Sequence, residues 1–286
     1  MNNATRWRQA LAERIAAVYA RDPQVSVVLL GSSAASGYAD KYSDLELLVF
    51  WTQAPAEEER ASAIEGAGGK IWRLYPDAEG EWSDEYHIGG VKVDGSNFTV
   101  ETAGRFLADV VERFETSFGK QVLISSILHG IPLLGAPLVE GWRTRSAVYP
   151  DGLARAMVQE HLWFEPRWWG PMLVERNDLL ALYEGVARQA SRVLRVLMGL
   201  NHIYDPGIKW MDQLIARFAI APGELSGRLK GVFREEPSAG VRLLHAIIDD
   251  GFALVDRHLP QVDTSRARWW FNHGRAPVDR PPDGAG

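Results

Sequence analysis

The two halves of the chain differ in how their apolar residues are spaced. In the first half, two short runs are almost wholly apolar and rich in β-branched residues, which is typical of buried strands, and further segments alternate polar and apolar residues. Strands are therefore expected at residues 25–30, 45–51 and 70–75, and further strands over residues 86–93 and 97–100 around a Gly89-Gly90 turn and an Asp94-Gly95 turn. Helical spacing predicts helices at residues 1–20, 55–64 and 102–118. Together these elements predict a small mixed sheet with helices.

Beyond Pro150 the strand pattern nearly disappears. Apolar residues from Leu179 to Leu200 recur at helical spacing and predict one long helix, and later helices are expected at residues 208–218, 224–233 and 239–258. We therefore expect an α+β fold class, in which a mixed-sheet domain of residues 1–149 precedes an all-helical domain of residues 150–262. Residues 263–286, which end in a stretch rich in Pro, Gly and Asp, are expected to be a disordered tail.

Composition narrows the classes of protein. The 286 residues are 46% hydrophobic and 24% charged, as in an ordinary globular protein, and no apolar run reaches the length of a membrane span, so a cytoplasmic location without a membrane partner is expected. The formal net charge of −6 argues against nucleic acid as the main partner. The absence of cysteine excludes disulfides and thiol chemistry and leaves oxygen and histidine as metal ligands.

The second apolar run begins with a pair of acidic residues. Side chains alternate along a strand, so Asp44 and Glu46 are expected on one face while Leu45 and Leu47 point into the core. Two carboxylates this close repel one another unless a cation lies between them. Magnesium meets that need because it takes carboxylate oxygens and keeps positions open for water and substrate phosphates. The pair therefore predicts a Mg²⁺ site.

A small, polar loop connects the first two predicted strands. Gly31 and Ser32 follow the first strand directly, where backbone N–H groups and a hydroxyl can approach a triphosphate. The loop is not a P-loop, because Gly37 is followed by Tyr38 where that motif has its phosphate-binding lysine. The loop and the paired acids together indicate phosphate chemistry.

The order of these features resembles a known superfamily. A hydrophobic strand, Gly31-Ser32, eleven further residues and then Asp44, a hydrophobic residue, Glu46 and another hydrophobic residue are similar to the motif of the DNA polymerase β-like nucleotidyltransferases. The resemblance is closest to the aminoglycoside and lincosamide antibiotic nucleotidyltransferases, in which a catalytic domain precedes a helical domain. It implies two Mg²⁺ ions, a nucleoside triphosphate as substrate, and phosphate contacts from Gly31, Ser32 and Ser43.

The resemblance also implies a third carboxylate from a later strand, acting as metal ligand or general base. Asp94 is the candidate, and Glu101 is the fallback. A turn at Asp94 and Gly95 is the alternative interpretation of the same residues.

Candidate residues in the helical half rest on weaker signals. The segment from Asn201 to Trp210 resembles one found in members of the antibiotic branch, so Lys209 is expected to contact a phosphate, with a solvated lysine as the alternative. Trp168, Glu175 and Asp178 are candidates for an acceptor-binding wall, or else packing and surface residues. The active site is expected between the two domains.

These features predict a Mg²⁺-dependent enzyme that transfers a nucleoside monophosphate, AMP from ATP, to a hydroxyl of a small molecule resembling an aminoglycoside antibiotic. Two alternatives stay open. One is a toxin–antitoxin type regulator that nucleotidylates or binds a partner protein. The other is a protein that binds nucleotide without transferring it.

Overall fold

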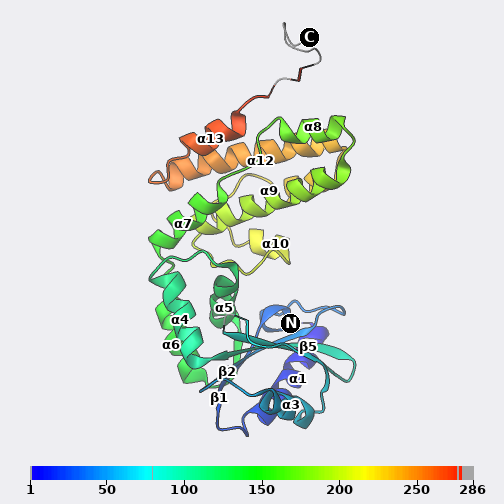
Figure 1. Cartoon of the computed structure of the whole chain (residues 1–286), viewed down its shortest axis with the longest axis vertical. Coiled ribbons are helices and arrows are strands. Elements are labelled where there is room, and N and C mark those ends of the chain that lie inside the picture. The colour runs from blue at the N-terminus through cyan, green and yellow to red at the C-terminus, as the bar shows by residue number, and fades with distance from the viewer. Residues whose placement is uncertain (1, 79, 276, 279–286) are drawn as a thin grey trace, which may run out of the picture. The chain divides into compact units, whose positions relative to one another are not determined.

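The structure, a computed structural model, describes residues 2–78, 80–275 and 277–278. The chain divides into two compact units, Met1–Tyr149 and Pro150–Gly286 (Figure 1). Each unit is described by itself below.

The first unit is built on a six-stranded sheet. Its strands are β1 (Val25–Leu30), β2 (Leu45–Trp51), β3 (Lys70–Leu74), β4 (Glu81–Ile88), β5 (Val91–Thr99) and β6 (Ile131–Leu134). The strand order is β3-β4-β5-β2-β1-β6, and β2 and β5 are parallel while the other neighbours are antiparallel. The predicted mixed sheet is confirmed. The helices are α1 (Asn3–Tyr19), α2 (Ser32–Ser36), α3 (Glu57–Gly66), α4 (Val100–Val111), α5 (Phe118–His129) and α6 (Ala136–Ser146).

The two faces of this sheet are covered differently. On one face, Leu45 and Leu47 of β2 are buried in a core shared with Ile15 of α1 and Ile64 of α3. On the other face the packing is aromatic and lies toward the end of β2, where Phe50 meets Phe98 of β5 and Trp142 of α6 at ring-centroid distances of 5.7 and 4.8 Å. This second face carries Glu46, because side chains alternate along a strand.

Several elements differ from the sequence-based expectation. β5 runs without a break from Val91 to Thr99, so the turn considered at Asp94 and Gly95 is not formed. The expected turn at Gly89 and Gly90, both with positive φ, is present. Helix α4 ends at Val111, short of the expected residue 118. Helix α5 and strand β6 were not expected from the sequence. Strand β6 pairs with β1 alone and contains Pro132, which an edge strand tolerates.

The second unit is helical within the described residues. Its helices are α7 (Asp151–His161), α8 (Trp169–Glu175), α9 (Leu179–Leu200), α10 (Met211–Ile215), α11 (Leu225–Arg234), α12 (Pro237–His258) and α13 (Ser265–Asn272). The long helix predicted from the apolar stripe is α9, and it packs on α7 and α12 around one core. Among the described helices, none is both long and apolar enough to cross a membrane.

Helix α13 corrects the expectation of a disordered tail over residues 263–286. Phe271 of α13 is fully buried, with its ring centroid 6.2 Å from that of Phe164 and 5.9 Å from that of Phe252. Burial of an aromatic ring of this size stabilises the helix against the rest of the unit. Residue 276 and residues 279–286 of the expected tail lie outside the described residues.

Candidate active site

The paired acids lie where the alternation places them. Asp44 immediately precedes β2 and Glu46 is its second residue, and both are half-buried, whereas Leu45 and Leu47 are buried in the core. The strand thus presents both carboxylates on the face that α1 and α3 leave open.

Strand pairing brings more acids to the same place. In the parallel pair of β2 and β5, Glu46 is directly opposite Asp94, and in the antiparallel pair of β5 and β4, Asp94 is directly opposite Glu85. Directly opposed residues share a face, so the three carboxylates form a row across three strands. The expected third carboxylate, Asp94, is therefore beside Glu46, while the fallback Glu101 lies exposed in the first turn of α4, beyond the end of β5.

Electrostatics indicate how crowded this row is. Burial raises the pKa of the Asp94 carboxyl, and the neighbouring Asp44 carboxylate raises that pKa further. Lys92 opposes this shift, because its ammonium nitrogen lies 2.8 Å from one Asp94 oxygen and 3.0 Å from the other. The same nitrogen lies 3.5 Å from Glu85, so one lysine is shared by two acids.

The donor set suits a hard divalent cation, since it consists of carboxylate oxygens that repel one another at close range. Within residues 2–78, 80–275 and 277–278, however, no three Asp, Glu or His side chains are gathered closely enough to hold a metal ion as they stand. The fold therefore places Asp44, Glu46 and Asp94 near one another, but their carboxylates do not converge on one metal position. Lys92 contacts both oxygens of Asp94.

The Gly31-Ser32 loop is joined directly to the acidic strand. The Gly31 N–H donates to the Glu46 carbonyl at 2.9 Å, and a Cβ at Gly31 would lie 3.1 Å from a methyl group of Leu48. A side chain at residue 31 would therefore crowd Leu48 unless the leucine shifted. Ser32, the next residue, is exposed and has a φ of 53°, which is an uncommon conformation for a residue with a side chain.

Helix α1 holds the loop through backbone carbonyls, a role that the sequence did not reveal. The Arg8 guanidinium, whose residue is 3% exposed, donates two hydrogen bonds to the Ser43 carbonyl at 3.0 and 2.6 Å. Burial lowers the pKa of Arg8, and the nearby carboxylates of Asp40 and Asp44 act against that shift. Gln9 donates to the Ala34 carbonyl at 2.9 Å. The segment before Asp44 is thereby fixed at both ends.

The hydroxyl of Ser43, expected to contact phosphate, has local partners. It donates to the Asp40 carboxylate at 3.1 Å and accepts from the Asp40 N–H at 2.9 Å. In this structure it therefore closes the turn before Asp44.

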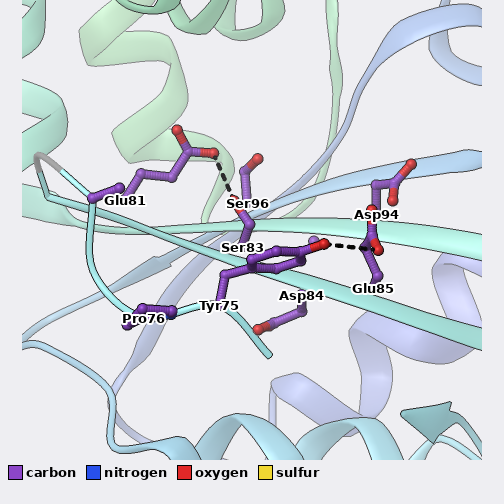
Figure 2. Close-up of a pocket in the computed structure, with 10 residues that line it drawn as sticks. Tyr75, Pro76, Glu81, Ser83, Asp84, Glu85, Asp94 and Ser96 are labelled. Carbon is purple, nitrogen blue, oxygen red and sulfur yellow. Dashed lines mark hydrogen bonds between the residues drawn. The ribbon is translucent and has the colours of Figure 1, made fainter. Parts of the chain in front are cut away.

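A pocket of about 410 Å³ opens beside Asp94 on the acidic face (Figure 2). Its polar lining comes from Tyr75, Glu81, Ser83, Asp84, Glu85, Asp94 and Ser96. The Tyr75 hydroxyl bonds the Glu85 carboxylate at 3.2 Å, and the Ser83 hydroxyl lies 3.5 Å from Glu81. Sequence reasoning missed this pocket, although the alternation of Glu81, Ser83 and Glu85 along β4 was a signal that could have revealed it.

The remaining candidates belong to the helical unit. Lys209 is exposed, in a loop that Asp205 anchors by accepting from the Gly207 N–H at 2.7 Å and from Arg195 at 2.8 Å. Asn201 closes the same loop onto Ile220.

The three expected acceptor residues surround α8. Trp168 is its N-cap, Glu175 is its last residue, and Asp178 is the N-cap of α9. Both acids are exposed, whereas Trp168 is half-buried beneath the guanidinium of Arg275 at 5.1 Å.

Comparison with known proteins gives a family model and several solved structures. Residues 121–211 match the family described as "Domain of unknown function (DUF4037)", a segment that crosses the boundary between the two units and contains none of the three acids. No curated protein matches the chain.

Among solved structures, the chain is similar to a nucleotidyltransferase-like protein from Exiguobacterium sibiricum 255-15, at 12% identity and a TM-score of 0.37, over 90% of this chain and 81% of the other. It is also similar to a cytoplasmic RNA terminal U-transferase (12% identity, TM-score 0.29, 55% of this chain and 48% of the other). A third match is Cid1 poly(U) polymerase (15% identity, TM-score 0.25, 53% and 46%). The chain spans about half the length of these last two proteins. At such TM-scores, function has to be argued from the residues.

Proposed function

We propose that this chain is a magnesium-dependent nucleotidyltransferase that transfers a nucleoside monophosphate, AMP from ATP, to a hydroxyl group of a small molecule. The observation that carries the proposal is the register of β2 and β5, which sets Glu46 directly beside Asp94, while Asp44 immediately precedes β2. A packed sheet gains nothing from three neighbouring acids, since like charges at this distance destabilise one another.

Asp44 and Glu46 would hold Mg²⁺, with Asp94 as the third ligand or as the base for the acceptor hydroxyl. Bound Mg²⁺ would neutralise the charge that develops on the transferred phosphoryl group and its leaving pyrophosphate. Burial raises the pKa of Asp94, which makes its carboxylate a stronger base toward the acceptor hydroxyl than an ordinary aspartate.

Phosphate contacts fall mainly to Ser32 in the sheet unit. The N–H of Gly31 already serves the Glu46 carbonyl, so the contribution of Gly31 is the close approach of the loop to β2. Ser32 is exposed directly after it and is held in an uncommon backbone conformation, as residues that contact ligands often are. Ser43 and, from the helical unit, Lys209 are further candidates for phosphate contacts.

The acceptor is best accommodated by the pocket beside Asp94. The carboxylates of Glu81 and Glu85 favour an acceptor that carries amino groups near its reacting hydroxyl, as an aminoglycoside-like molecule does. Trp168, Glu175 and Asp178 of the helical unit stay candidates for acceptor binding from the sequence alone.

The test is incubation of the full chain with ATP, GTP, CTP or UTP, Mg²⁺ and a panel of hydroxyl-bearing acceptors, followed by assay of pyrophosphate and mass spectrometry of the product. The proposal expects acceptor-dependent pyrophosphate release that Asp44→Ala abolishes. Full activity of Asp44→Ala would show the assignment to be wrong. Nucleotide binding without product in any combination would favour a protein that binds nucleotide only.

A further inference from the structure

Lys92 stands out because a lysine lies where the proposed function requires a metal ion. Its ammonium nitrogen contacts both oxygens of Asp94, at 2.8 and 3.0 Å, and reaches Glu85 at 3.5 Å. Lys92 precedes Asp94 by two residues in β5 and therefore shares its face. Continued by one residue, the register of β2 and β5 also places Lys92 across from Asp44. The ammonium thus contacts Asp94 and Glu85, at the strand position next to Asp44.

We propose that Lys92 is an internal cation that holds Asp94 in the metal-free protein and that divalent metal binds by exchange with it, an inference that rests on the proposed function. Lys92 contacts both oxygens of Asp94, so a metal ion shared by Asp94 and Asp44 competes with the lysine for the same oxygens. The contact between Lys92 and Asp94 explains why the acids of the site lie near one another but do not converge on one metal position.

The lysine is suited to leave. Its side chain is 37% exposed, and a lysine carries a compact, well-hydrated charge on a flexible four-carbon stem. Mg²⁺ carries twice the charge of the ammonium group and can be coordinated by oxygens of several acids at once. The ammonium group donates only three hydrogen bonds, each along an N–H direction. A metal ion that arrives with a nucleoside triphosphate adds phosphate oxygens to its ligand set and therefore displaces Lys92 more readily than a free ion does.

If metal binds by exchange with Lys92, replacing the lysine by an uncharged residue should increase the affinity for metal, whereas a substitution that damages the fold should decrease it. Removing the positive charge of Lys92 should tighten metal binding, since a cation a few ångströms from the carboxylates competes with and repels an incoming divalent ion. Lys92→Met keeps the length of the side chain and removes the charge, and Lys92→Arg keeps the charge. Lys70→Met is the matched control, because Lys70 is exposed on β3 in the same cross-strand row as Lys92, with His87 between them.

The experiment is calorimetric titration of the full chain with Mn²⁺ alone, for the wild type and each variant, with and without Asp44→Asn. Lys92→Met is expected to bind Mn²⁺ roughly three- to tenfold more tightly than wild type, with Lys92→Arg and Lys70→Met within about twofold of it. Asp44→Asn should abolish the gain. A gain of affinity cannot result from unfolding, so a folding defect would not imitate this result.

Three outcomes would overturn the inference. If wild type binds Mn²⁺ through Asp44 and Lys92→Met binds equally or less tightly, the exchange is wrong and the proposed function stands. If Lys70→Met gains as much as Lys92→Met, the effect is one of general surface charge and the exchange is again wrong. If neither wild type nor Lys92→Met binds Mn²⁺ in a way that depends on Asp44, the proposed function fails and the exchange fails with it.

Discussion

Acidic residues on the two faces of strands β4 and β5 differ in burial and in the kind of partner that neutralises them. Asp84 and Glu85 are consecutive, so one points to each face. Asp84, whose side chain is 0% exposed, forms an ion pair with Arg60 of α3 and accepts from the Asn97 amide at 2.6 Å. Asp94 on the other face is 32% exposed and shares Lys92 with Glu85.

The difference separates an acid that supports the fold from an acid that is available for chemistry. On the buried face, every partner of Asp84 is fixed: Arg60 is itself buried, and Asn97 is held by the Trp51 indole N–H at 2.9 Å. On the open face, the partner of Asp94 is a flexible, partly exposed lysine. An acid with buried and rigid partners keeps those partners, whereas one neutralised by a mobile cation can exchange that cation for another.

The largest expected effect is on catalysis, from Asp94→Asn. The amide keeps the shape of the side chain but can neither bind Mg²⁺ as a carboxylate does nor take a proton. The rate of nucleotidyl transfer should fall roughly 10³-fold, while the free energy of unfolding changes by less than about 1 kcal/mol because the Lys92 pair is partly exposed. Pyrophosphate release and thermal denaturation of the same preparation measure the two quantities. A variant as active as wild type would remove Asp94 from the site.

The same substitution on the other face, Asp84→Asn, should lower stability strongly and activity only slightly. It leaves the Arg60 guanidinium buried without its carboxylate, so the free energy of unfolding should fall by about 3 kcal/mol. Activity per folded molecule should stay within about threefold of wild type, because Asp84 points away from the acidic row. Urea denaturation and assays at low temperature check both. Loss of activity without loss of stability would contradict the division between the two faces.

Burial affects stability in the helical unit as well, through the half-buried base His245. Burial, together with the nearby Arg167 charge, lowers the pKa of His245 to about 4, against a weaker opposing effect of Asp249, and its ring packs edge-on against Phe271 at 5.5 Å. The unfolded chain takes up this proton near pH 6.5, so stability is fully present above that pH and is lost as the pH falls toward 4.

Between pH 7.5 and 5 this should lower the free energy of unfolding by about 1–2 kcal/mol, allowing for the partial exposure of the ring. Denaturation midpoints of wild type and His245→Leu over this range measure the effect. The leucine variant should show a correspondingly flatter profile, and an identical slope for both proteins would assign the pH dependence to other groups.

The parts of the fold that follow from local patterning could be predicted from the sequence. Residues 25–30 and 45–51 form β1 and β2 with the expected bounds, because nearly every side chain in them is apolar and buried. Helix α5 was missed because polar Gln121 and Ser125 are buried among its apolar residues and blur the helical pattern. Strand β6 was missed because four residues containing a proline carry little strand signal. Helix α13 was missed because its arginines and the Gly and Pro residues beyond it resemble a tail.

For the site, the acids could be identified but their partners could not. Asp44 and Glu46 follow from alternation within one strand, whereas the pairing of Glu46 with Asp94 depends on which strands become neighbours, which no local pattern records. Lys92 and Arg8 were missed for the same reason, since each acts through residues brought near by the fold. Whether Lys209 and Trp168 take part stays a prediction, because they belong to the other unit.

The smallest expected effect is at Glu85, which lies on the open face at the edge of the acidic row. Glu85→Gln keeps a hydrogen-bond acceptor for Tyr75 at 3.2 Å and removes the weaker of the two contacts of Lys92, at 3.5 Å. The free energy of unfolding should change by less than about 0.5 kcal/mol, since such exposed pairs contribute little. Because Glu85 lines the pocket but does not face Glu46, KM for a cationic acceptor should rise a few-fold, roughly two to five, while kcat is nearly unchanged. Steady-state kinetics with a cationic and a neutral acceptor separate the two parameters. A fall in kcat as large as that of Asp94→Asn would place Glu85 among the reacting groups and move the boundary of the site by one strand.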